Sequence, residues 1–322
     1  MIPIKDYSFS MRGSTDPKKS IMYKTDGINI NPFIIRKAIV GPDYTEPFYV
    51  EDISGSENIL KIKDKTNQPV RNTIEYSFDK KTWLILGTTS NTEISMTIPS
   101  NTRVYLRSIA NTWSKNDGLG CPLTCTGNYN VGGNIMSMLY GSNFTGEELV
   151  FPPNTDRNFR NFLFCDKLVN ANDLLLPATT LTPYCYYALF SGCTSLTSAP
   201  ELPAMTLANS CYAWMFNNCS SLTTAPELPA TTLVSGSYNS IFKNCTSLNY
   251  IKVGFTEWPD VSSSISMATY TWTQLSVNTT GTFVCPAALP QYFNASGNNT
   301  HSYSSISGYT NAIPYGWTVE TY

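Results

Sequence analysis

The chain has 322 residues, enough for two or three compact units of ordinary size. Charged residues make up only 14% of the sequence and the formal net charge is -2, so we expect no basic surface for nucleic acid. No stretch approaches the roughly 20 apolar residues that span a bilayer, and the nearest, Phe33–Val40, is interrupted by Arg36 and Lys37, so we expect no membrane insertion.

Residues 1–45 form the first predicted segment, an arm whose first 30 or so residues are polar and show no sustained apolar period. A segment of this composition buries too little apolar surface to offset the entropy of ordering, so we expect a partner to hold it. The apolar patch Pro32–Ile35, followed by Ala38–Val40, is the predicted contact with a neighbouring copy or another subunit. The arm is therefore predicted to anchor the protein in an assembly.

Residues 46–115 show short alternating runs that predict an antiparallel β-sandwich. The predicted strands are Ile59–Ile62, Ile74–Phe78, Trp83–Leu86, Ile94–Ile98 and Val104–Ile109. Turn residues such as Asp79-Lys80-Lys81 separate them, and Trp83 and Tyr105 are expected in the core. The segment from Ile74 to Trp83 resembles immunoglobulin or fibronectin-type modules.

Three further segments follow. Residues 116–150 are predicted to be a linker and a cap for the N-terminal end of a repeat array at 151–255. Residues 256–322 are predicted to be a β-rich cap at its C-terminal end, because a terminal repeat exposes an apolar face that needs a cover. Strands are expected at Gly281–Cys285 and Trp317–Val319, with a loop between them from Asn294 to Gly308.

A 26-residue period organises the middle of the chain. The pattern Cys185-Tyr186-x-x-Leu189-Phe190-x-x-Cys193-Thr194-Ser195-Leu196 recurs as Cys211-Tyr212-x-x-Met215-Phe216-x-x-Cys219-Ser220-Ser221-Leu222. A third copy runs from Tyr238 to Leu248, with Ser237 in place of the leading cysteine, and a looser first copy runs from Phe162 to Leu168. Such repetition predicts a solenoid, in which each unit buries its apolar face against the next.

Within a unit, the apolar residues from Cys185 to Cys193 have the spacing of one face of a short helix. Leu196, Ala199 and Leu202 follow at steps of three between prolines, which favours an extended rung. We therefore expect each unit to contain one short helix and one extended segment. The predicted fold class is mixed β and α/β.

The repeats resemble the BspA-like leucine-rich repeats of Bacteroidales surface proteins and of the fibre and virion proteins of their crAss-like phages. The resemblance rests on Phe190-x-x-Cys193-Thr194-Ser195-Leu196 with Pro226-Glu227-Leu228-Pro229-Ala230-Thr231-Thr232-Leu233, and it covers roughly residues 145–255. Two flanks, Gly133–Gly141 and Gly316–Thr321, are also similar to these proteins. The resemblance implies a leucine-rich-repeat solenoid that serves recognition.

No set of residues predicts catalysis, a metal site or a cofactor. The single histidine, His301, lies in a polar loop without a nucleophile tied to it by a motif. Cys121 and Cys125 lack a second pair of ligands, and Gly13–Ser20 lacks the second glycine of a phosphate-binding loop. Cys193, Cys219 and Cys245 share one repeat position, which predicts a buried ladder of free thiols.

The remaining chemistry is recognition. Repeat positions that differ between units are expected to face solvent, and they carry a mixture of aromatic, amide and cationic side chains. The predicted ligand-binding residues are Tyr187, Trp214, Asn217, Asn218, Lys243 and Asn244. This mixture is typical of surfaces that stack on sugars or bind protein partners.

The resemblance implies a phage virion structural protein, a head or tail fibre or a decoration protein. Its arm would attach to a capsid or tail protein, its repeats would bind a host-surface glycan or protein, and a symmetric homo-oligomer, first of all a trimer, is expected. The alternatives are a BspA-like bacterial cell-surface adhesin and an intracellular interaction scaffold. The start, Met1–Asp6, shows no secretory leader, which favours the virion over the adhesin.

Overall fold

The computed structural model describes residues 8–11, 22–25, 42–63, 73–88, 93–109, 122–152, 156–163, 165–258, 269, 272–273, 277–290 and 313–322. The chain divides into two compact units, Met1–Tyr44 and Thr45–Tyr322. In the first unit, strand β1 (Ser8–Met11) pairs antiparallel with strand β2 (Met22–Thr25). The predicted docking patch at 32–40 lies outside the described residues, and the anchoring role of the arm stays a prediction.

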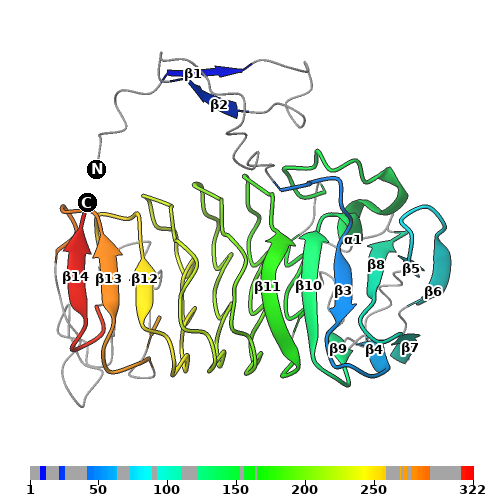
Figure 1. The fold of residues 1–322 in the computed structure, drawn as a ribbon. Helices are drawn as coiled ribbons and strands as arrows, with labels where there is room; N and C mark the ends of the chain where they lie inside the picture. The colour runs from blue at the N-terminus through cyan, green and yellow to red at the C-terminus, as the bar shows by residue number, and fades with distance from the viewer. Residues whose placement is uncertain are drawn as a thin grey trace. The chain divides into compact units, whose positions relative to one another are not determined.

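The second unit is mostly β with very little helix, and much of it is a stack of rungs like a β-solenoid (Figure 1). Its largest sheet has the strand order β11-β10-β3-β8-β5-β6, and a smaller one has the order β7-β4-β9. The strands of the larger sheet are β3 (Tyr49–Asp52), β5 (Thr73–Ser77), β6 (Leu84–Thr88), β8 (Arg103–Ser108), β10 (Tyr129–Asn134) and β11 (Leu168–Leu175). The strands of the smaller sheet are β4 (Asn58–Lys63), β7 (Glu93–Ile98) and β9 (Leu123–Cys125).

The five strands predicted between residues 59 and 109 are confirmed as β4 to β8, and they pair antiparallel. Tyr105 is buried as expected, with 8% of its surface exposed. The expectation for Trp83 was wrong, because this side chain is only half-buried. It lies just before β6, at the edge of the sheet, where the Arg107 guanidinium lies over its ring at 4.1 Å.

The larger sheet runs without a break from these antiparallel strands into the repeats. Strand β10 pairs antiparallel with β3 on one side and parallel with β11 on the other. Two glycines allow β10 to lie close against β3. Gly133 has a φ of 71°, and a Cβ at Gly132 would collide with the Tyr49 side chain of β3. The two regions therefore share one sheet, while the predicted boundaries at 46–115, 116–150, 151–255 and 256–322 stay predictions.

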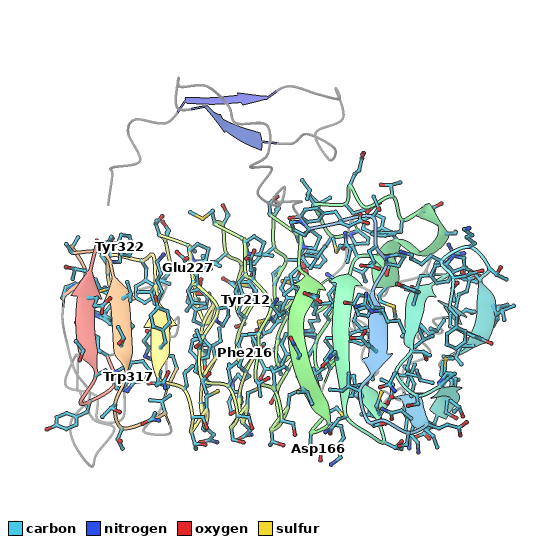
Figure 2. The ribbon with its side chains drawn as sticks, viewed as in Figure 1. Asp166, Tyr212, Phe216, Glu227, Trp317 and Tyr322 are labelled. Carbon is cyan, nitrogen blue, oxygen red and sulfur yellow. The ribbon has the colours of Figure 1, made fainter. Side chains whose placement is uncertain are left out.

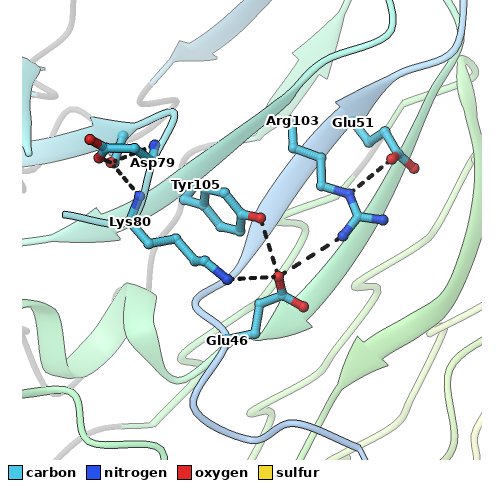
Figure 3. A network of polar contacts seen from close by, with 7 residues as sticks. Glu46, Glu51, Asp79, Lys80, Arg103 and Tyr105 are labelled. Atoms are coloured by element: carbon cyan, nitrogen blue, oxygen red, sulfur yellow. Dashed lines mark hydrogen bonds and ion pairs between the residues drawn. The ribbon is translucent and has the colours of Figure 1, made fainter. Parts of the chain in front are cut away.

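A polar network fixes the chain entering β3 to the neighbouring strands (Figure 3). The Glu46 carboxylate accepts hydrogen bonds from Lys80 Nζ at 3.5 Å and from the Tyr105 hydroxyl at 3.2 Å. Arg103 donates to Glu51 at 2.9 Å. Backbone N–H groups of the turn, chiefly that of Thr82, lower the pKa of Asp79 to about 2. These contacts hold the turn after β5 in one conformation.

The repeats contain no helix in the segments that the structure describes, so the predicted short helix was wrong. Backbone N–H groups alternate between two acceptors along each turn segment. Those of Tyr187 and Leu189 donate to carbonyls three residues back in the same rung, at 3.1 and 3.2 Å. Those of Ala188 and Phe190 donate to carbonyls of the next rung, at 2.8 and 2.9 Å. An α-helix would direct every N–H into its own rung, four residues back, and would leave none to join the rungs.

Backbone conformation follows the same alternation. A residue with positive φ recurs at every fourth position of the turns, so the repeating unit is a four-residue turn. These residues are Arg157, Asn161, Tyr184, Ala188, Gly192, Ser210, Trp214, Asn218, Gly236, Ser240 and Asn244. A period of four places two neighbouring side chains inward at each step, which reproduces the apolar spacing that had suggested a helix.

Equivalent side chains stack into ladders inside the rungs, and Figure 2 labels Tyr212 and Phe216 among them. The ring of Tyr212 lies 5.7 Å from that of Tyr186, with 6° between the ring planes. The ring of Phe216 lies 5.3 Å from that of Phe190, with 4° between the planes. All four side chains are buried. The predicted stacking of units around a shared apolar core is therefore confirmed.

The cysteine ladder is also present and buried. The Cys219 thiol donates to the Phe190 carbonyl at 3.1 Å, and the Cys245 thiol donates to the Phe216 carbonyl at 3.0 Å. Burial raises the pKa of Cys245 to about 12 and that of Cys219 well above the usual value of a thiol. Cys121, the partner considered for Cys125, lies outside the described residues.

This burial predicts slow thiol chemistry. We expect Cys219 and Cys245 in the folded protein to react with iodoacetamide at pH 9 roughly a thousandfold more slowly than in guanidinium, because reaction requires both opening and thiolate formation. Peptide mass spectrometry after timed quenching assigns the rate to each cysteine. Labelling of Cys219 at its unfolded rate would contradict the buried ladder.

The C-terminal residues continue the stack as predicted strands. Strands β12 (Tyr250–Lys252), β13 (Thr282–Cys285) and β14 (Thr318–Thr321) form a parallel sheet. The Phe242 ring at the end of its ladder meets Trp272 at 6.5 Å, and Trp272 in turn contacts Phe283 at 6.0 Å. These aromatic rings cover the end of the ladder. The predicted loop at Asn294–Gly308 lies outside the described residues.

Candidate functional site on the turns of the rungs

The turns of four successive rungs bring one set of side chains to the surface, two from each rung. We call this set the turn-side row. It consists of Arg157 and Arg160, Tyr184 and Tyr187, Trp214 and Asn218, and Lys243 and Asn244. The rungs are in register through backbone hydrogen bonds such as Asn161 N–H to the Tyr187 carbonyl at 3.1 Å and Trp214 N–H to the Asn239 carbonyl at 2.8 Å. The row is therefore built on a rigid, hydrogen-bonded stack.

Each aromatic ring of the row has a cation over it from a neighbouring rung. The Arg157 guanidinium lies 5.1 Å from the centre of the Tyr184 ring, and that of Arg160 lies 5.0 Å from the centre of the Tyr187 ring. Lys243 Nζ lies 5.2 Å from the centre of the Trp214 ring. Such contacts hold the long cationic side chains and the rings in place together.

Amide side chains extend the row beside Trp214. Asn244 Nδ2 donates to Asn218 Oδ1 at 2.8 Å, from one rung to the next. The bond uses one donor of Asn244 and leaves the Asn218 amide nitrogen to face solvent or a ligand. The row thus offers rings, cations and amide groups within one strip of surface.

Five of the six predicted ligand-binding residues lie in this row, namely Tyr187, Trp214, Asn218, Lys243 and Asn244. The sixth, Asn217, was expected to face solvent and does not, since only 5% of its surface is exposed. Its Nδ2 donates to Ser191 Oγ, at the same position of the preceding rung, at 3.3 Å. A comparison of units showed only that this position varies: the Asn217 side chain is buried, whereas Lys243, at the same position of the next rung, is half-buried and lies in the row. Whether the other five bind a ligand stays a prediction.

Arg157, Arg160 and Tyr184 were missed by the sequence reasoning. Tyr184 precedes the repeating pattern by one residue, and the two arginines belong to the irregular first copy. Phe159 in that copy pairs with Cys185 through its N–H at 2.8 Å, so its rung begins earlier than Phe162. The structure aligns Phe159 with Tyr186, an offset of 27 residues, so the 26-residue period did not place the two arginines opposite Tyr184 and Tyr187.

A second feature is a groove between the proline-rich corners of two rungs, with a volume of about 350 Å³. It is lined by Ala199, Pro200, Glu201, Leu202, Pro203, Pro226, Glu227 and Pro229. Glu227 is paired with Lys252 of the next rung at 3.0 Å, and hydrogen bonding to Glu227 raises the pKa of Lys252.

Figure 2 shows Glu227 and Tyr322 along one edge of the rungs and Asp166 and Trp317 along the other.

Among the described residues, no three His, Cys, Asp or Glu side chains lie together in a way that could hold a metal ion. His301 lies outside those residues. No helix in the described ranges is long and apolar enough to cross a membrane. The raised pKa of Cys193, caused by burial, disfavours the thiolate that a nucleophile requires.

Comparisons with family models, curated proteins and solved structures gave no significant match to the chain.

Proposed function

We propose that the protein is a non-enzymatic recognition protein whose ligand binds along the turn-side row. The observation that carries the proposal is that Tyr187 and Trp214 reach the surface on adjacent rungs, each with a cation against its ring. Partly exposed aromatic rings supply a large contact area at a small entropic cost, and the amides beside them supply directional hydrogen bonds. The proposed ligand class is a host-surface glycan or protein.

The proposal includes a finer description of the fold. We interpret residues 151–255 as leucine-rich repeats of the BspA-like kind, on the strength of the 26-residue recurrence and its stacked ladders. We interpret residues 46–115 as an immunoglobulin-like sandwich, on the strength of the antiparallel strands β3 to β8. In this arrangement the sandwich acts as a spacer and the repeats carry the recognition surface.

The proposed setting is a phage virion, in which residues 1–45 attach the protein to a capsid or tail protein and copies associate, first of all as a trimer. Its support is the resemblance of the repeats to those of Bacteroidales surface proteins and of their phages. A bacterial cell-surface adhesin is the alternative with the same support. Mass spectrometry of purified phage particles and of host envelope fractions distinguishes the two by where the protein is found.

Trp214→Ala is expected to weaken binding to Bacteroidales cells by roughly thirtyfold, the effect of removing an aromatic hot spot. The fold should tolerate the change, because Ala188 occupies the equivalent position of the preceding rung with a φ of 52°. Flow cytometry of cells with fluorescently labelled protein measures the affinity, and thermal unfolding verifies the fold of each variant.

Tyr315→Ala is the matched control, since it removes an aromatic ring that is 57% exposed and lies outside the row. Its affinity for cells should equal that of the wild type. A folded Trp214→Ala protein that binds as tightly as this control would exclude the row as the recognition surface.

A further inference from the structure

We infer that the ligand of the turn-side row is an acidic polysaccharide lying across the rungs, a step that rests on the function proposed above. Three features of the row lead to this ligand class: two cations, Arg160 and Lys243, with no carboxylate partner among the described residues, aromatic rings on the rungs between them, and a pair of linked amides. Each feature can bind a different chemical group of an acidic polysaccharide.

At each end of the row, one cation has no carboxylate partner among the described residues. Within the described part of the chain, Arg160 and Lys243 contact an aromatic ring and no carboxylate. An aromatic ring holds a cation in place without neutralising its charge. These two side chains therefore remain available to pair with an anion from outside the protein.

Other cations that lie over rings in this protein are arranged differently. Lys80, Arg103, Arg107 and Lys252 each lie over an aromatic ring and also contact a carboxylate. Among the described residues, Arg160 and Lys243 thus differ from these four cations, because each contacts a ring and no carboxylate. This difference indicates that the carboxylate is supplied by a ligand.

The charge of the turn segments around the row also favours an anionic ligand. The turn segments 156–161, 182–192, 208–218 and 234–244 contain three arginine or lysine residues and a single acidic residue, Asp156. In a chain with a net charge of -2, these segments form a locally positive strip. Such a strip attracts anionic ligands and repels cationic ones.

The geometry favours an extended ligand over a small anion. Arg160 and Lys243 lie on the first and fourth rungs, three steps of roughly 4.8 Å, and hence roughly 14 Å apart along the stack. Tyr187 and Trp214 lie on the rungs between them, where their rings can stack on the apolar faces of sugar rings. The Asn218 and Asn244 amides can bind hydroxyl groups. A linear polysaccharide with spaced acidic groups meets all these contacts at once.

The test measures binding of the full-length protein to immobilised polygalacturonate, to neutral dextran and to poly-L-glutamate at low ionic strength. We expect polygalacturonate to bind, dextran to bind weakly or not at all, and poly-L-glutamate to bind less tightly because it has no sugar rings. The double change Arg160→Gln and Lys243→Gln should weaken polygalacturonate binding roughly threefold to thirtyfold, as expected for two exposed ion pairs.

The matched control is Lys63→Gln with Lys81→Gln, which removes the same charge from two exposed lysines outside the row. It should leave binding to polygalacturonate unchanged. Equal weakening by both double variants, or equal binding of poly-L-glutamate, would overturn the inference in favour of non-specific attraction. Absence of polygalacturonate binding by the wild type would also overturn it.

The cell-binding assay with Trp214→Ala keeps the two proposals separate. If Trp214→Ala abolishes cell binding while the Arg160 and Lys243 variant does not alter it, the row recognises a neutral ligand. The proposed function then stands and the acidic ligand class falls. If neither variant alters cell binding, both proposals fail.

Discussion

Phe216→Ala is expected to lower the free energy of unfolding by roughly 3 to 5 kcal/mol, the usual cost of truncating a buried phenylalanine. Phe216 has no exposed surface, and its ring is stacked between those of Phe190 at 5.3 Å and Phe242 at 5.9 Å. Its backbone N–H donates to the Ile241 carbonyl of the next rung at 2.9 Å. The rungs are held apart at a fixed spacing by such bonds, so they cannot close over the cavity that alanine leaves.

Guanidinium unfolding followed by circular dichroism measures this change, with Phe78→Ala as the control. Phe78 is 48% exposed and lies outside the ladder, so its truncation should cost less than about 1 kcal/mol. If Phe216→Ala and Phe78→Ala unfold at the same denaturant concentration, the phenylalanine ladder does not stabilise the stack.

Deletion of residues 1–44 is expected to leave the rest of the chain folded and to abolish its incorporation into phage particles. The first expectation follows from the division of the chain into two compact units at Tyr44 and Thr45. The second unit has a buried hydrophobic core of its own, which extends from Phe48 to Trp317. The second expectation follows from the proposed anchoring role of the arm, whose removal takes away the contacts that would hold the protein in a virion.

Thermal unfolding tests the first expectation, and the truncated protein should have the midpoint of the full-length protein within a few degrees. Complementation of a phage that lacks the gene, followed by quantitative mass spectrometry of particles, tests the second. Incorporation at the full-length level would place the attachment surface in residues 45–322. A folded full-length protein absent from all particles would instead contradict the virion setting.

Sequence patterning alone was sufficient to predict the stack. The 26-residue recurrence of Tyr186, Phe190 and Cys193 identified the inward positions, because equivalent residues in a repeat must share one environment. The ladders of Tyr212 and Phe216 and the buried Cys219 and Cys245 follow from it. The strands β4 to β8 were equally predictable, since alternation of apolar and polar residues has only one simple structural interpretation.

Five residues of the turn-side row were predicted by comparing the repeat units with one another, because a position that varies between units is not constrained by packing in the core. The comparison failed at Asn217, where the variable residues Ser191 and Asn217 bond to each other inside the stack. Variation shows that a position tolerates different side chains. It does not show which way the side chain points.

Only the tertiary structure determined that the apolar segment of each repeat forms four-residue turns and not a helix. The apolar spacing from Cys185 to Cys193 fits a helical period of 3.6 and a turn period of four, and a single unit offers no reason to choose. The neighbouring rung supplies carbonyl acceptors for every second N–H, as in the bond from Phe190 to the Met215 carbonyl. These bonds offset the cost of positive φ at residues such as Tyr184 and Trp214, roughly 1 to 2 kcal/mol each.

The continuity of the sheet and the composition of the row also depend on the tertiary structure. Strand β10 joins the antiparallel strands to β11 across nearly forty residues of sequence, a pairing that no local pattern encodes. The contact of Arg160 with the Tyr187 ring is likewise not encoded locally, because the register between rungs determines which side chains meet. Local periodicity determined which side chains of this protein face inward, and inter-rung hydrogen bonding decided what the surface presents.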